Sequence, residues 1–597
     1  MSVLAQYNPL KTLWIPGAEI AEPQGIIVVV GPNSSGKTLF LRDIETYLLT
    51  GISTFVVCQG IAPQRPNDYQ SFVDELIARN YLQQLPGNDK QYRTYVPFMS
   101  QKGPTNANQR QPFQLPTLQK AYNEFVFERG ANNPGWFGPI GITLAALLSL
   151  DQRRLVCNKV SSFDYKQGTP DHPVQGLFVN SEAQDRLAEE TGNVFGNAVW
   201  LDISENGVYQ LRVSGSRQLP PHGEMNNPLQ ARHYTPIESE GDGYRSYVGI
   251  CLSLLLATRP VSLIDEPELC LHPPQAYHIG RFIGHFAKQD HVTLVATHSS
   301  HVLRGVLETG KRVTVIRLTR HKKEFSGRLI AERELVDNLR NPRTRAEAIL
   351  DGVFSKGVVL VESEGDREEY QAASESIEDY PSREVHFVPV GGTGGFAEPL
   401  RFYRSLDIPA AIIADLDAVC DTDMIATLSK LLVPTMVNAQ DIIGKLRAVV
   451  QQIKSLPPPV SEHDAKERLK RLSEESWNWK QGGDNLLRRK LNELDGQLKR
   501  IQKLKEGGVA AYHGYHEIQV QLLEVITQYS LIGLFFVPVG ELEDWVNSLM
   551  GDVPKNSISK SERAAVAANR IREAESKSGD IWEFVQKVLD YLRGVSE

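Results

Sequence analysis

The sequence predicts an α/β protein with two domains, each built on a parallel sheet. The chain has 597 residues, which is more than a single hydrophobic core holds. Apolar runs of strand length alternate with helical segments in two series, one before about residue 340 and one after about residue 355. Such alternation is typical of parallel sheets covered by helices. A hydrophobic content of 41% and a charged content of 23% fit ordinary globular domains.

The first series opens with the stretch GIIVVVGPNSSGKTLFLRDIETYLL, in which a buried strand over Ile26–Val30 leads through a loop into a helix. From about residue 60 to 235 the chain is polar and rich in Pro, Asn and Gln, and the sequence assigns no elements there. Regular patterns return with ESEGDGYRSYVGICLSLLLA, a loop followed by an apolar helix. The strand VSLIDEPE, a helix from about Pro273 and the strand VTLVATHSS complete this series.

The second series begins near Lys356. Its predicted strands are GVVLVE, VHFVPVGG and AAIIADLD, with a late candidate in LFFVPVGELE. Between the last two, residues 421–530 form a polar segment that reads as charged amphipathic helices. The VPVG sequence occurs at both 388–391 and 537–540, and we expect these to be two strand ends of one sheet.

Composition excludes several classes of protein. The net charge of −8 argues against a broadly basic nucleic-acid binder, although a local cationic groove would suffice to hold phosphates. The five cysteines form no CxxC pair, which fits reduced thiols. The N-terminus lacks the plan of a signal peptide, and no apolar run approaches the length of a membrane span. We therefore expect a cytoplasmic protein with no membrane partner.

The loop GPNSSGKT follows the first strand, at residues 31–38. Its glycines let backbone N–H groups close around phosphate oxygens, and the N-terminus of the next helix adds positive potential. Lys37 is placed to reach the β and γ phosphates of ATP, and the Thr38 hydroxyl to bind Mg²⁺. The residues that this loop assigns to the nucleotide are Gly31, Asn33, Ser34, Ser35, Gly36, Lys37 and Thr38.

Two further strand ends supply chemistry for ATP hydrolysis. In LIDEPE, Asp265 ends an apolar strand, where it can hold Mg²⁺ through water, and Glu266 can orient and polarise the attacking water. In VATHSS, His298 ends the next strand and is suited to contact a γ-phosphate. Each motif alone is also typical of a solvated strand end. Their order after the phosphate loop favours an ATPase.

Together these elements resemble the ABC-type ATPases, including the SMC-like branch. The resemblance implies a signature loop, for which SEGDG at residues 239–243 is the candidate. It departs from the usual Ser-Gly-Gly pattern by carrying Glu240 and Asp242. In that family the loop completes the nucleotide site of a second subunit, which implies a head-to-tail homodimer or a higher even oligomer. The family's glutamine loop falls at Gln59 or Gln101. The residues assigned to the nucleotide here are Ser239, Gly241 and Gly243.

Acidic side chains follow the strands of the second series. In VVLVESEGDREEY, Glu362 closes an apolar strand and Asp366 follows at the start of a predicted helix. In AAIIADLDAVCD, Asp415 and Asp417 end another strand, and residues i and i+2 of a strand point to one face. Such hard oxygen ligands suit Mg²⁺ or Mn²⁺, and two ions could clamp the attacking and leaving oxygens of a phosphodiester.

This order of acids resembles the Toprim domain, in which an acidic strand end and an Asp four residues later precede a later Asp-x-Asp. The glycine-rich VPVGGTGGF between the two motifs also matches that domain. The family's glycine after the first glutamate is Ser363 here. The other acids of the stretch, Glu364, Glu368 and Glu369, are interpreted as bystanders.

An SMC-like ATPase followed by a Toprim domain resembles the OLD (overcoming lysogenization defect) family of ATP-dependent nucleases. The resemblance implies that a later acidic motif and a lysine join the nuclease site. GELEDW offers Glu541 and Glu543, and Lys577 is our choice of lysine. We expect two domains and two inserted regions: an ATPase domain over 1–340 with an inserted, dimerisation-type region over about 60–235, and a Toprim domain over 355–597 with a helical insertion over about 421–530.

The resemblance implies an ATP-hydrolysing, metal-dependent DNA endonuclease or nickase. Relatives of this family act in anti-phage defence beside a helicase or a retron reverse transcriptase with its DNA. One alternative is an SMC-like DNA-binding and repair ATPase whose Toprim domain only binds nucleic acid, but this would require a long heptad arm. A topoisomerase or primase is a third reading, and the chain carries no primase zinc motif.

An acidic chain must hold DNA with local cationic surface, and residues 485–505 are the densest candidate. A solvated helical face explains the same pattern. The six cations in question are Arg488, Arg489, Lys490, Lys499, Arg500 and Lys503.

Overall fold

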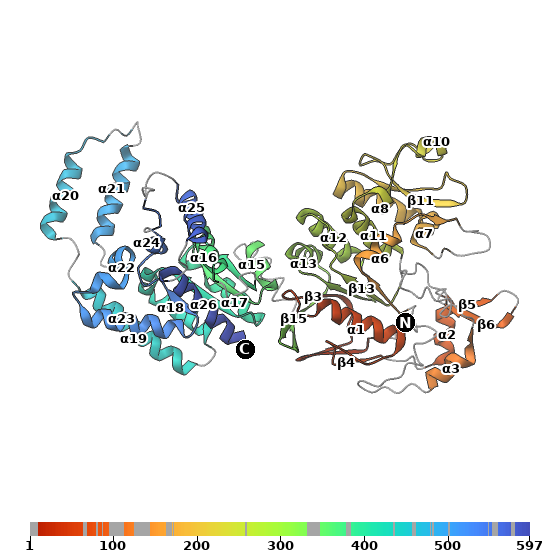
Figure 1. Ribbon diagram of the computed structural model, residues 1–597, viewed down its shortest axis with the longest axis horizontal. Coiled ribbons are helices and arrows are strands. Elements are labelled where there is room, and N and C mark those ends of the chain that lie inside the picture. Colours follow the sequence, from red (N-terminus) through yellow and green to blue (C-terminus); the bar gives the residue numbers. More distant parts are fainter. Residues whose placement is uncertain are drawn as a thin grey trace. The chain divides into compact units, whose positions relative to one another are not determined.

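A computed structural model of the chain describes residues 10–63, 68–78, 82–85, 88–94, 113–123, 144–162, 170, 172–256, 259–289, 291–330, 347–377, 384–433, 436–456, 461–477, 479, 483–498, 502–546, 549–551, 559–574 and 579–596. The chain divides into two compact units, Met1–Leu339 and Arg340–Glu597, and each has its own sheet and core (Figure 1). No helix in the part described is both long and apolar enough to cross a membrane.

The first unit is built on a six-stranded sheet. In order across the sheet the strands are β16 (Glu324–Ile330), β15 (Val313–His321), β3 (Gly25–Val30), β14 (Val292–Ala296), β13 (Val261–Asp265) and β8 (Ala145–Leu148). All neighbours pair in parallel except β16, which runs antiparallel to β15. Strands β3 and β14 are buried along their whole length, which is why they read as unbroken apolar runs. Parallel strands end at one edge, so the loops that follow them meet there.

Helices cover this sheet and shape its functional edge. They are α1 (Lys37–Thr50), α6 (Leu150–Val156), α11 (Asp242–Leu256), α12 (Pro273–Phe286) and α13 (Ser300–Leu307). Helix α1 packs on β8, β13 and β14, and its Phe40 and Ile44 share one buried cluster with Ile27 and Val29 of β3. The predicted helix near Pro273 is confirmed. The helix α11, predicted from its apolar run, packs against α6.

The region 60–235 is not one insertion, because part of it belongs to the central sheet. Strand β8 pairs in parallel with β13, and α6 follows it directly. The other strands and helices of the first unit, including two strands that precede β3, form smaller sheets and the helices beside them. They are β1 (Thr12–Ile15), β2 (Ala18–Ala21), β4 (Gly60–Ala62), α2 (Tyr69–Ala78), β5 (Leu82–Leu85), β6 (Asn88–Thr94), β7 (Phe113–Gln114), α3 (Leu115–Asn123), β9 (Val160–Ser161), α7 (Pro173–Val179), α8 (Ser181–Phe195), β10 (Val199–Asp202), β11 (Val208–Val213), α9 (His222–Met225), α10 (Pro228–Ala231) and β12 (Thr235–Pro236).

The second unit has a four-stranded parallel sheet, and all four predicted strands are in it. The order is β18 (Val385–Pro389), β17 (Gly357–Val361), β19 (Ala410–Ala414) and β20 (Leu534–Phe536). The two VPVG sequences therefore lie at the two edge strands of one sheet, as predicted. The helices that build this unit are α15 (Glu347–Asp351), α16 (Glu364–Glu375), α17 (Ala397–Ser405), α18 (Thr422–Leu432), α24 (Leu542–Val546), α25 (Lys560–Glu573) and α26 (Asp580–Ser596).

The predicted helical insertion between β19 and β20 is confirmed. After α18 it comprises α19 (Met436–Ser455), α20 (Glu462–Glu474), α21 (Gly483–Leu498), α22 (Gln502–Gly507) and α23 (His516–Ser530). Helix α20 has no buried residue and is covered by ion pairs at helical spacing, such as Lys470–Glu474. In Figure 1 helices α20 and α21 extend side by side away from the sheet of this unit.

Candidate nucleotide and metal sites

The phosphate loop between β3 and α1 is packed so closely that its glycines have no substitute. A Cβ on Gly31 would lie 2.0 Å from the carbonyl oxygen of Leu318 in β15. A Cβ on Gly36 would lie 2.6 Å from the ring of Phe325 in β16. Both glycines, and Ser34 between them, have a positive φ. The loop is thus held in shape by the neighbouring β15–β16 hairpin.

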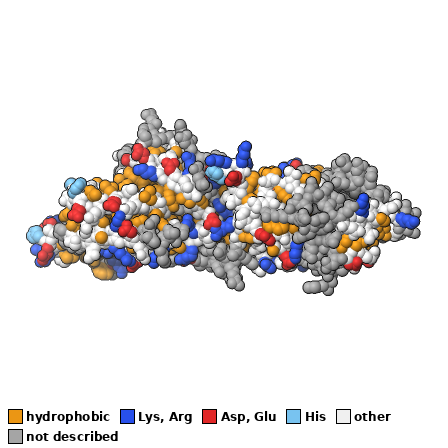
Figure 2. Space-filling view, turned by 90° about the horizontal axis from the view of Figure 1, so that it is seen from below, with side chains coloured by type: hydrophobic (Ala, Val, Ile, Leu, Met, Phe, Trp, Pro, Cys, Tyr) orange, Lys and Arg blue, Asp and Glu red, His pale blue; other side chains and the backbone are white. Residues whose placement is uncertain are grey.

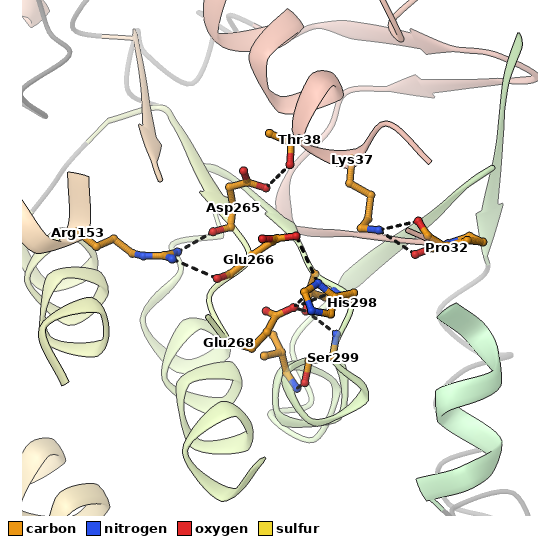
Figure 3. Close-up of polar contacts among 12 residues, drawn as sticks. Pro32, Lys37, Thr38, Arg153, Asp265, Glu266, Glu268, His298 and Ser299 are labelled. Atoms are coloured by element: carbon orange, nitrogen blue, oxygen red, sulfur yellow. Dashed lines mark hydrogen bonds and ion pairs between the residues drawn. The ribbon is translucent and has the colours of Figure 1, made fainter. Parts of the chain in front are cut away.

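Lys37 and Thr38 begin α1 on the inner side of this loop (Figure 3). The Lys37 ammonium donates to the carbonyl oxygens of Gly31 at 2.8 Å and Pro32 at 3.0 Å. Burial lowers the pKa of Lys37, while the nearby carboxylates act in the opposite direction; they are Glu266, Glu268 and Asp265. The Thr38 hydroxyl donates to Oδ1 of Asp265 at 3.0 Å, so the phosphate loop and the end of β13 meet. This hydroxyl–carboxylate pair is the arrangement that would hold Mg²⁺.

Three carboxylates and a histidine converge beside Lys37. Glu266 follows β13 with a φ of 46°, and its Oε1 lies 3.4 Å from Nδ1 of His298. Glu268 lies on the other side, with its Oε1 3.3 Å from the same nitrogen. Hydrogen bonding to His298 lowers the pKa of Glu266, and the same bond raises the pKa of His298. An ionised Glu266 is suited to accept a proton from water. Burial raises the pKa of Asp265.

Arg153 of α6 fixes the backbone of this acidic turn, and the sequence analysis missed it. Its guanidinium donates to the carbonyl oxygens of Asp265 at 2.7 Å and Glu266 at 3.1 Å (Figure 3). The side chain is fully buried, and burial lowers its pKa to about 10. Two such bonds support the left-handed conformation of Glu266. Only the tertiary structure reveals this role, because α6 lies in a region without a sequence pattern.

The candidate signature loop lies at the start of α11. Ser239 ends a 3₁₀ helix, and Asp242 forms an ion pair with Arg154 at 3.0 Å. A Cβ on Gly243 would lie 2.1 Å from the carbonyl oxygen of Cys270, whereas one on Gly241 would meet open space. Gly243 is therefore required for packing, and Gly241 is free to serve another purpose. Its contact with a second subunit stays a prediction.

The two glycines of this loop provide a matched pair of substitutions. We expect Gly243→Ala to lower the free energy of unfolding by about 1–3 kcal/mol, because either α11 or the Cys270 loop must shift. Gly241→Ala should leave the melting temperature unchanged. If Gly241 contacts nucleotide across a dimer, its variant should nevertheless hydrolyse ATP more slowly. Thermal melts and ATPase assays check this, and equal melting temperatures for both variants would contradict the packing argument.

The candidates for the glutamine loop remain open. The Gln59 backbone N–H donates to the Trp14 carbonyl oxygen at 2.8 Å, which anchors the segment preceding β4. Gln101 lies outside the described residues.

In the second unit, Glu362 and Asp415 meet at the carboxyl ends of β17 and β19. Oε1 of Glu362 accepts a 3.2 Å hydrogen bond from the Asp415 backbone N–H. Burial raises the pKa of Glu362 to about 7. Burial, followed by the charge of Glu362, raises that of Asp415 to about 8. Each value means that the folded chain holds an ionised carboxylate here at a cost.

The expectation that Asp415 and Asp417 share one face of a strand was wrong. Strand β19 ends at Ala414, and a 3₁₀ helix over Leu416–Cys420 begins directly after Asp415. The period-two argument does not hold for that geometry. Asp417 is still close enough to raise the pKa of both Asp415 and Glu362.

Asp366 has a structural role in addition to its predicted one. Its Oδ2 accepts a 2.9 Å hydrogen bond from the backbone N–H of Ser363, and the Ser363 hydroxyl accepts one of 3.3 Å from the Asp366 backbone N–H. The two residues thus form a capping box at the N-terminus of α16. The serine in the family's glycine position is explained by this cap. Burial raises the pKa of Asp366.

The late acids Glu541 and Glu543 each pair with a lysine that sequence reasoning missed. Lys505 of α22 lies 2.8 Å from Glu541, and Lys560 of α25 lies 3.2 Å from Glu543. Burial acts to lower the pKa of Lys505, but Glu541 and then Asp417 and Asp415 raise it overall. The predicted Lys577 lies outside the described residues.

Tight packing brings Lys505 from the helical insertion to this site. A Cβ on Gly540 would lie 2.3 Å from the Lys505 carbonyl oxygen, and the Val509 backbone N–H donates to Pro538 at 2.9 Å. The end of the insertion is therefore joined closely to the loop after β20. No sequence pattern around Lys505 distinguishes it from Lys503, the other lysine of α22.

Glu369 does not lie on the surface, as a bystander would. Its side chain is 5% exposed, and its Oε2 is buried with no hydrogen-bond partner among the residues that the structure describes. Burial raises its pKa to about 8, with Glu543 and Asp366 adding to the shift. Glu364, by contrast, forms a surface ion pair with Arg367. By their lysine neighbours the acids form two groups: Glu362, Asp415, Asp417 and Glu541 near Lys505, and Asp366, Glu369 and Glu543 near Lys560. Asp366 links the two groups, because its charge also raises the pKa of Glu362 and Asp415.

The donor set fits a divalent cation. In the part of the chain that the structure describes, no three His, Cys, Asp or Glu side chains converge as the ligands of one ion. The carboxylates are nevertheless hard oxygen donors, and burial together with their mutual repulsion raises their pKa values, so a cation beside them would stabilise the ionised form. Lys505 and Lys560 supply part of that charge.

Comparisons with known families agree with this two-part organisation. Residues 353–417 match the model described as "Overcoming lysogenization defect protein-like, TOPRIM domain". Residues 159–304 match the model described as "AAA domain, putative AbiEii toxin, Type IV TA system". The chain joins a P-loop ATPase domain to an OLD-like Toprim domain. The ATPase match contains the acidic turn and His298, and the phosphate loop precedes it.

Solved structures similar to the chain include heads of SMC proteins. An SMC head bound to the C-winged helix domain of ScpA is 12% identical with a TM-score of 0.32, covering 54% of this chain and 98% of that one. The SMC head domain from Thermotoga maritima is 14% identical with a TM-score of 0.27, covering 54% and 99%. A head with an extended coiled coil from Pyrococcus furiosus is 10% identical with a TM-score of 0.29, covering 55% and 98%. No curated protein matches the chain.

Proposed function

We propose that the chain is an ATP-hydrolysing, divalent-metal-dependent DNA endonuclease or nickase. The observation that supports the nuclease most directly is the meeting of Glu362 and Asp415 at the carboxyl ends of β17 and β19. Both carboxylates have raised pKa values, and Asp417 acts on both. A Toprim domain used only to bind nucleic acid would have no need to bury this many acids, because acids repel phosphates.

In the ATPase unit, each step has a residue placed for it. The backbone of the phosphate loop and Lys37 bind the phosphates, and Thr38 and Asp265 stand where Mg²⁺ would be held. Glu266 takes a proton from water as its oxygen attacks the γ-phosphorus, and ADP leaves. The bonds from Arg153 keep the Glu266 backbone in the conformation that this requires.

In the Toprim unit, divalent cations would supply charge stabilisation for the attacking and leaving oxygens of the phosphodiester. The candidates to hold one or two such cations are the acids of both groups: Glu362, Asp366, Glu369, Asp415, Asp417, Glu541 and Glu543. Lys505 and Lys560, which pair with Glu541 and Glu543 at this site, would be placed to contact phosphate oxygens of the DNA. Lys505 and Lys560 are thus two candidates for the lysine role that was predicted for Lys577.

At least one of the six cations predicted to bind DNA in the helical insertion is already paired within the chain. Lys490 pairs with Glu475 at 2.6 Å and lies 5.2 Å from the ring centroid of Trp477. Lys499 and Arg500 lie outside the described residues, and Arg488 is exposed on α21. On the face shown in Figure 2, Lys and Arg side chains occur in several separate groups among acidic and apolar ones. Binding through the six predicted cations stays a prediction.

The partners and the biological setting also stay predictions. A homodimer follows from the proposed role of the signature loop, and an anti-phage role beside a helicase or retron reverse transcriptase rests on the family resemblance alone. The alternative of an SMC-like DNA-binding ATPase lacks its long arm, because the longest helix of the insertion, α19, has 20 residues.

The function is tested with the purified full chain and a supercoiled plasmid. We expect nicking or linearisation with Mg²⁺ or Mn²⁺, none with a chelator, and a change in rate when ATP is added. ATP hydrolysis should require Mg²⁺. If the active form is a dimer, the turnover number per chain should rise with protein concentration. DNA retention without cleavage under every metal and nucleotide condition would favour the binding-only alternative.

A further inference from the structure

His298 is held on one side of its ring by two carboxylates. Nδ1 lies within 3.4 Å of Glu266 and 3.3 Å of Glu268 (Figure 3). The same Glu268 oxygen accepts 2.8 Å hydrogen bonds from the His298 backbone N–H and from the Thr297 hydroxyl. Ring and backbone of His298 are therefore tied to a single carboxylate. Within the described residues, Nε2 has no hydrogen-bond partner, so it remains available to a ligand.

The hydrogen bonds that Glu268 accepts do not by themselves explain why this buried residue is a glutamate. Its side chain is 9% exposed, and Oε2 is buried without a hydrogen-bond partner in the described part of the chain. Burying a carboxylate with an unsatisfied oxygen is costly. A glutamine would accept the bonds from Thr297 and His298 through its amide oxygen and would bury no charge. The structure thus retains a charge that its own hydrogen bonds do not require.

The charge has a consequence for the tautomer of His298. A neutral imidazole that donates Nδ1–H to a carboxylate has a lone pair on Nε2, which cannot donate to a phosphate oxygen. Only the imidazolium donates from both nitrogens. Three titratable groups act on this ring: Glu266 and Glu268 favour the imidazolium, and Lys37 opposes it. The bond to Glu266 is the largest influence, and the pKa of His298 is raised overall.

We propose that Glu268 is a positioning residue of the ATPase site, which together with Glu266 holds His298 as an imidazolium that donates Nε2–H to the γ-phosphate of ATP. The inference rests on the ATP hydrolysis of the proposed function and adds a role that the sequence motifs did not assign. The histidine then acts as a cation beside Lys37 rather than as a neutral contact. In this proposal Glu268 acts on the phosphate through His298, whose ring and backbone it contacts.

The pH dependence of ATP hydrolysis separates this role from a structural one. Because the folded pKa of His298 is raised, activity should be present below that pKa and be lost as the pH rises through it. Glu268→Gln keeps both hydrogen bonds and removes the charge. We expect the alkaline limb of kcat to move to lower pH by about one unit, with the melting temperature and KM little changed.

Two further variants are compared with Glu268→Gln, one that removes the titrating ring and one that serves as a control. His298→Gln has a side-chain donor that does not titrate, so its profile should lack the alkaline limb that the parent shows. Glu308→Gln removes a carboxylate that pairs with Arg304 after the same strand, and its profile should match the parent. Full pH profiles at saturating ATP and Mg²⁺ are measured for all four proteins.

The outcomes are distinct. A uniform fall in kcat for Glu268→Gln at every pH, or no change, would show that the residue is only structural. If Glu268→Gln does not fold, an alkaline limb that persists in His298→Gln still overturns the inference. If the parent hydrolyses no ATP at any pH, the proposed function itself fails, whatever the variants do.

Discussion

Asp415→Asn is expected to abolish plasmid cutting while ATP turnover continues at the parent rate. The Asp415 backbone donates to Glu362, and the charges of Glu362, Asp366, Asp417 and Glu541 all act on its side chain, so its loss removes a ligand from the first acidic group. We expect cleavage to fall at least roughly a hundredfold, because even outer-shell changes at metal sites cost that much. The ATP-binding residues lie in the other unit and should be unaffected.

The stability of this variant provides a second readout. The folded pKa of Asp415, about 8, exceeds that of an unfolded carboxyl, so the metal-free fold loses stability as the pH rises from the unfolded pKa to about 8, and the loss persists above that pH. Asparagine lacks that charge, and the melting temperature at pH 7 without metal should therefore stay equal or rise. Mg²⁺ should raise the melting temperature of the parent more than that of the variant, because only the parent keeps the full ligand set.

Glu368→Gln is the control for this experiment, since Glu368 lies on α16 outside both acidic groups. Its cutting rate and its response to Mg²⁺ should match the parent. Parent-rate nicking by Asp415→Asn would show that the acids are a solvated surface and would remove the nuclease from the proposal.

The second large effect is expected at the phosphate loop. Lys37→Ala removes the only ammonium among the described residues that reaches the loop carbonyls, and we expect ATP affinity to fall roughly tenfold to a hundredfold. Titration calorimetry with Mg²⁺ and ATP measures this. Lys323→Ala, at an exposed position between β15 and β16, should bind ATP as the parent does.

Glu266→Gln separates binding from chemistry at the same site. The amide cannot accept the proton of water, so kcat should fall at least about a hundredfold while ATP affinity stays within a few-fold of the parent. Cleavage measured on this ATP-trapped variant shows whether nucleotide binding or hydrolysis controls the nuclease. Unchanged turnover in both Lys37→Ala and Glu266→Gln would place the ATPase site elsewhere.

The sequence by itself was sufficient for the parts of this protein whose signals are local. The phosphate loop, the strand ends carrying Asp265 and His298, and the four strands of the Toprim sheet all follow from short apolar runs and their flanking residues. Buried parallel strands are apolar on both faces, so they stand out against loops and helices. The order of these elements along the chain then determined the two-part architecture.

Tertiary structure decided the contacts that join distant segments. Strand β8 entered the central sheet, and Arg153 reached the carbonyl of Asp265, because sheet pairing and burial select partners that no local period marks. Lys505 reached Glu541 because Gly540 allows α22 to approach the loop after β20.

The same limit explains the errors around the acidic motifs. Asp417 entered a 3₁₀ helix because β19 ends at Ala414, and a strand's end depends on how far its neighbours pair rather than on its own residues. Glu369 was interpreted as a bystander of the acidic site, but it is buried on α16, against which α25 packs. Local sequence therefore placed the carboxylates near one another, and only long-range packing decided which of them lie inside, which are paired with lysines and which remain on the surface.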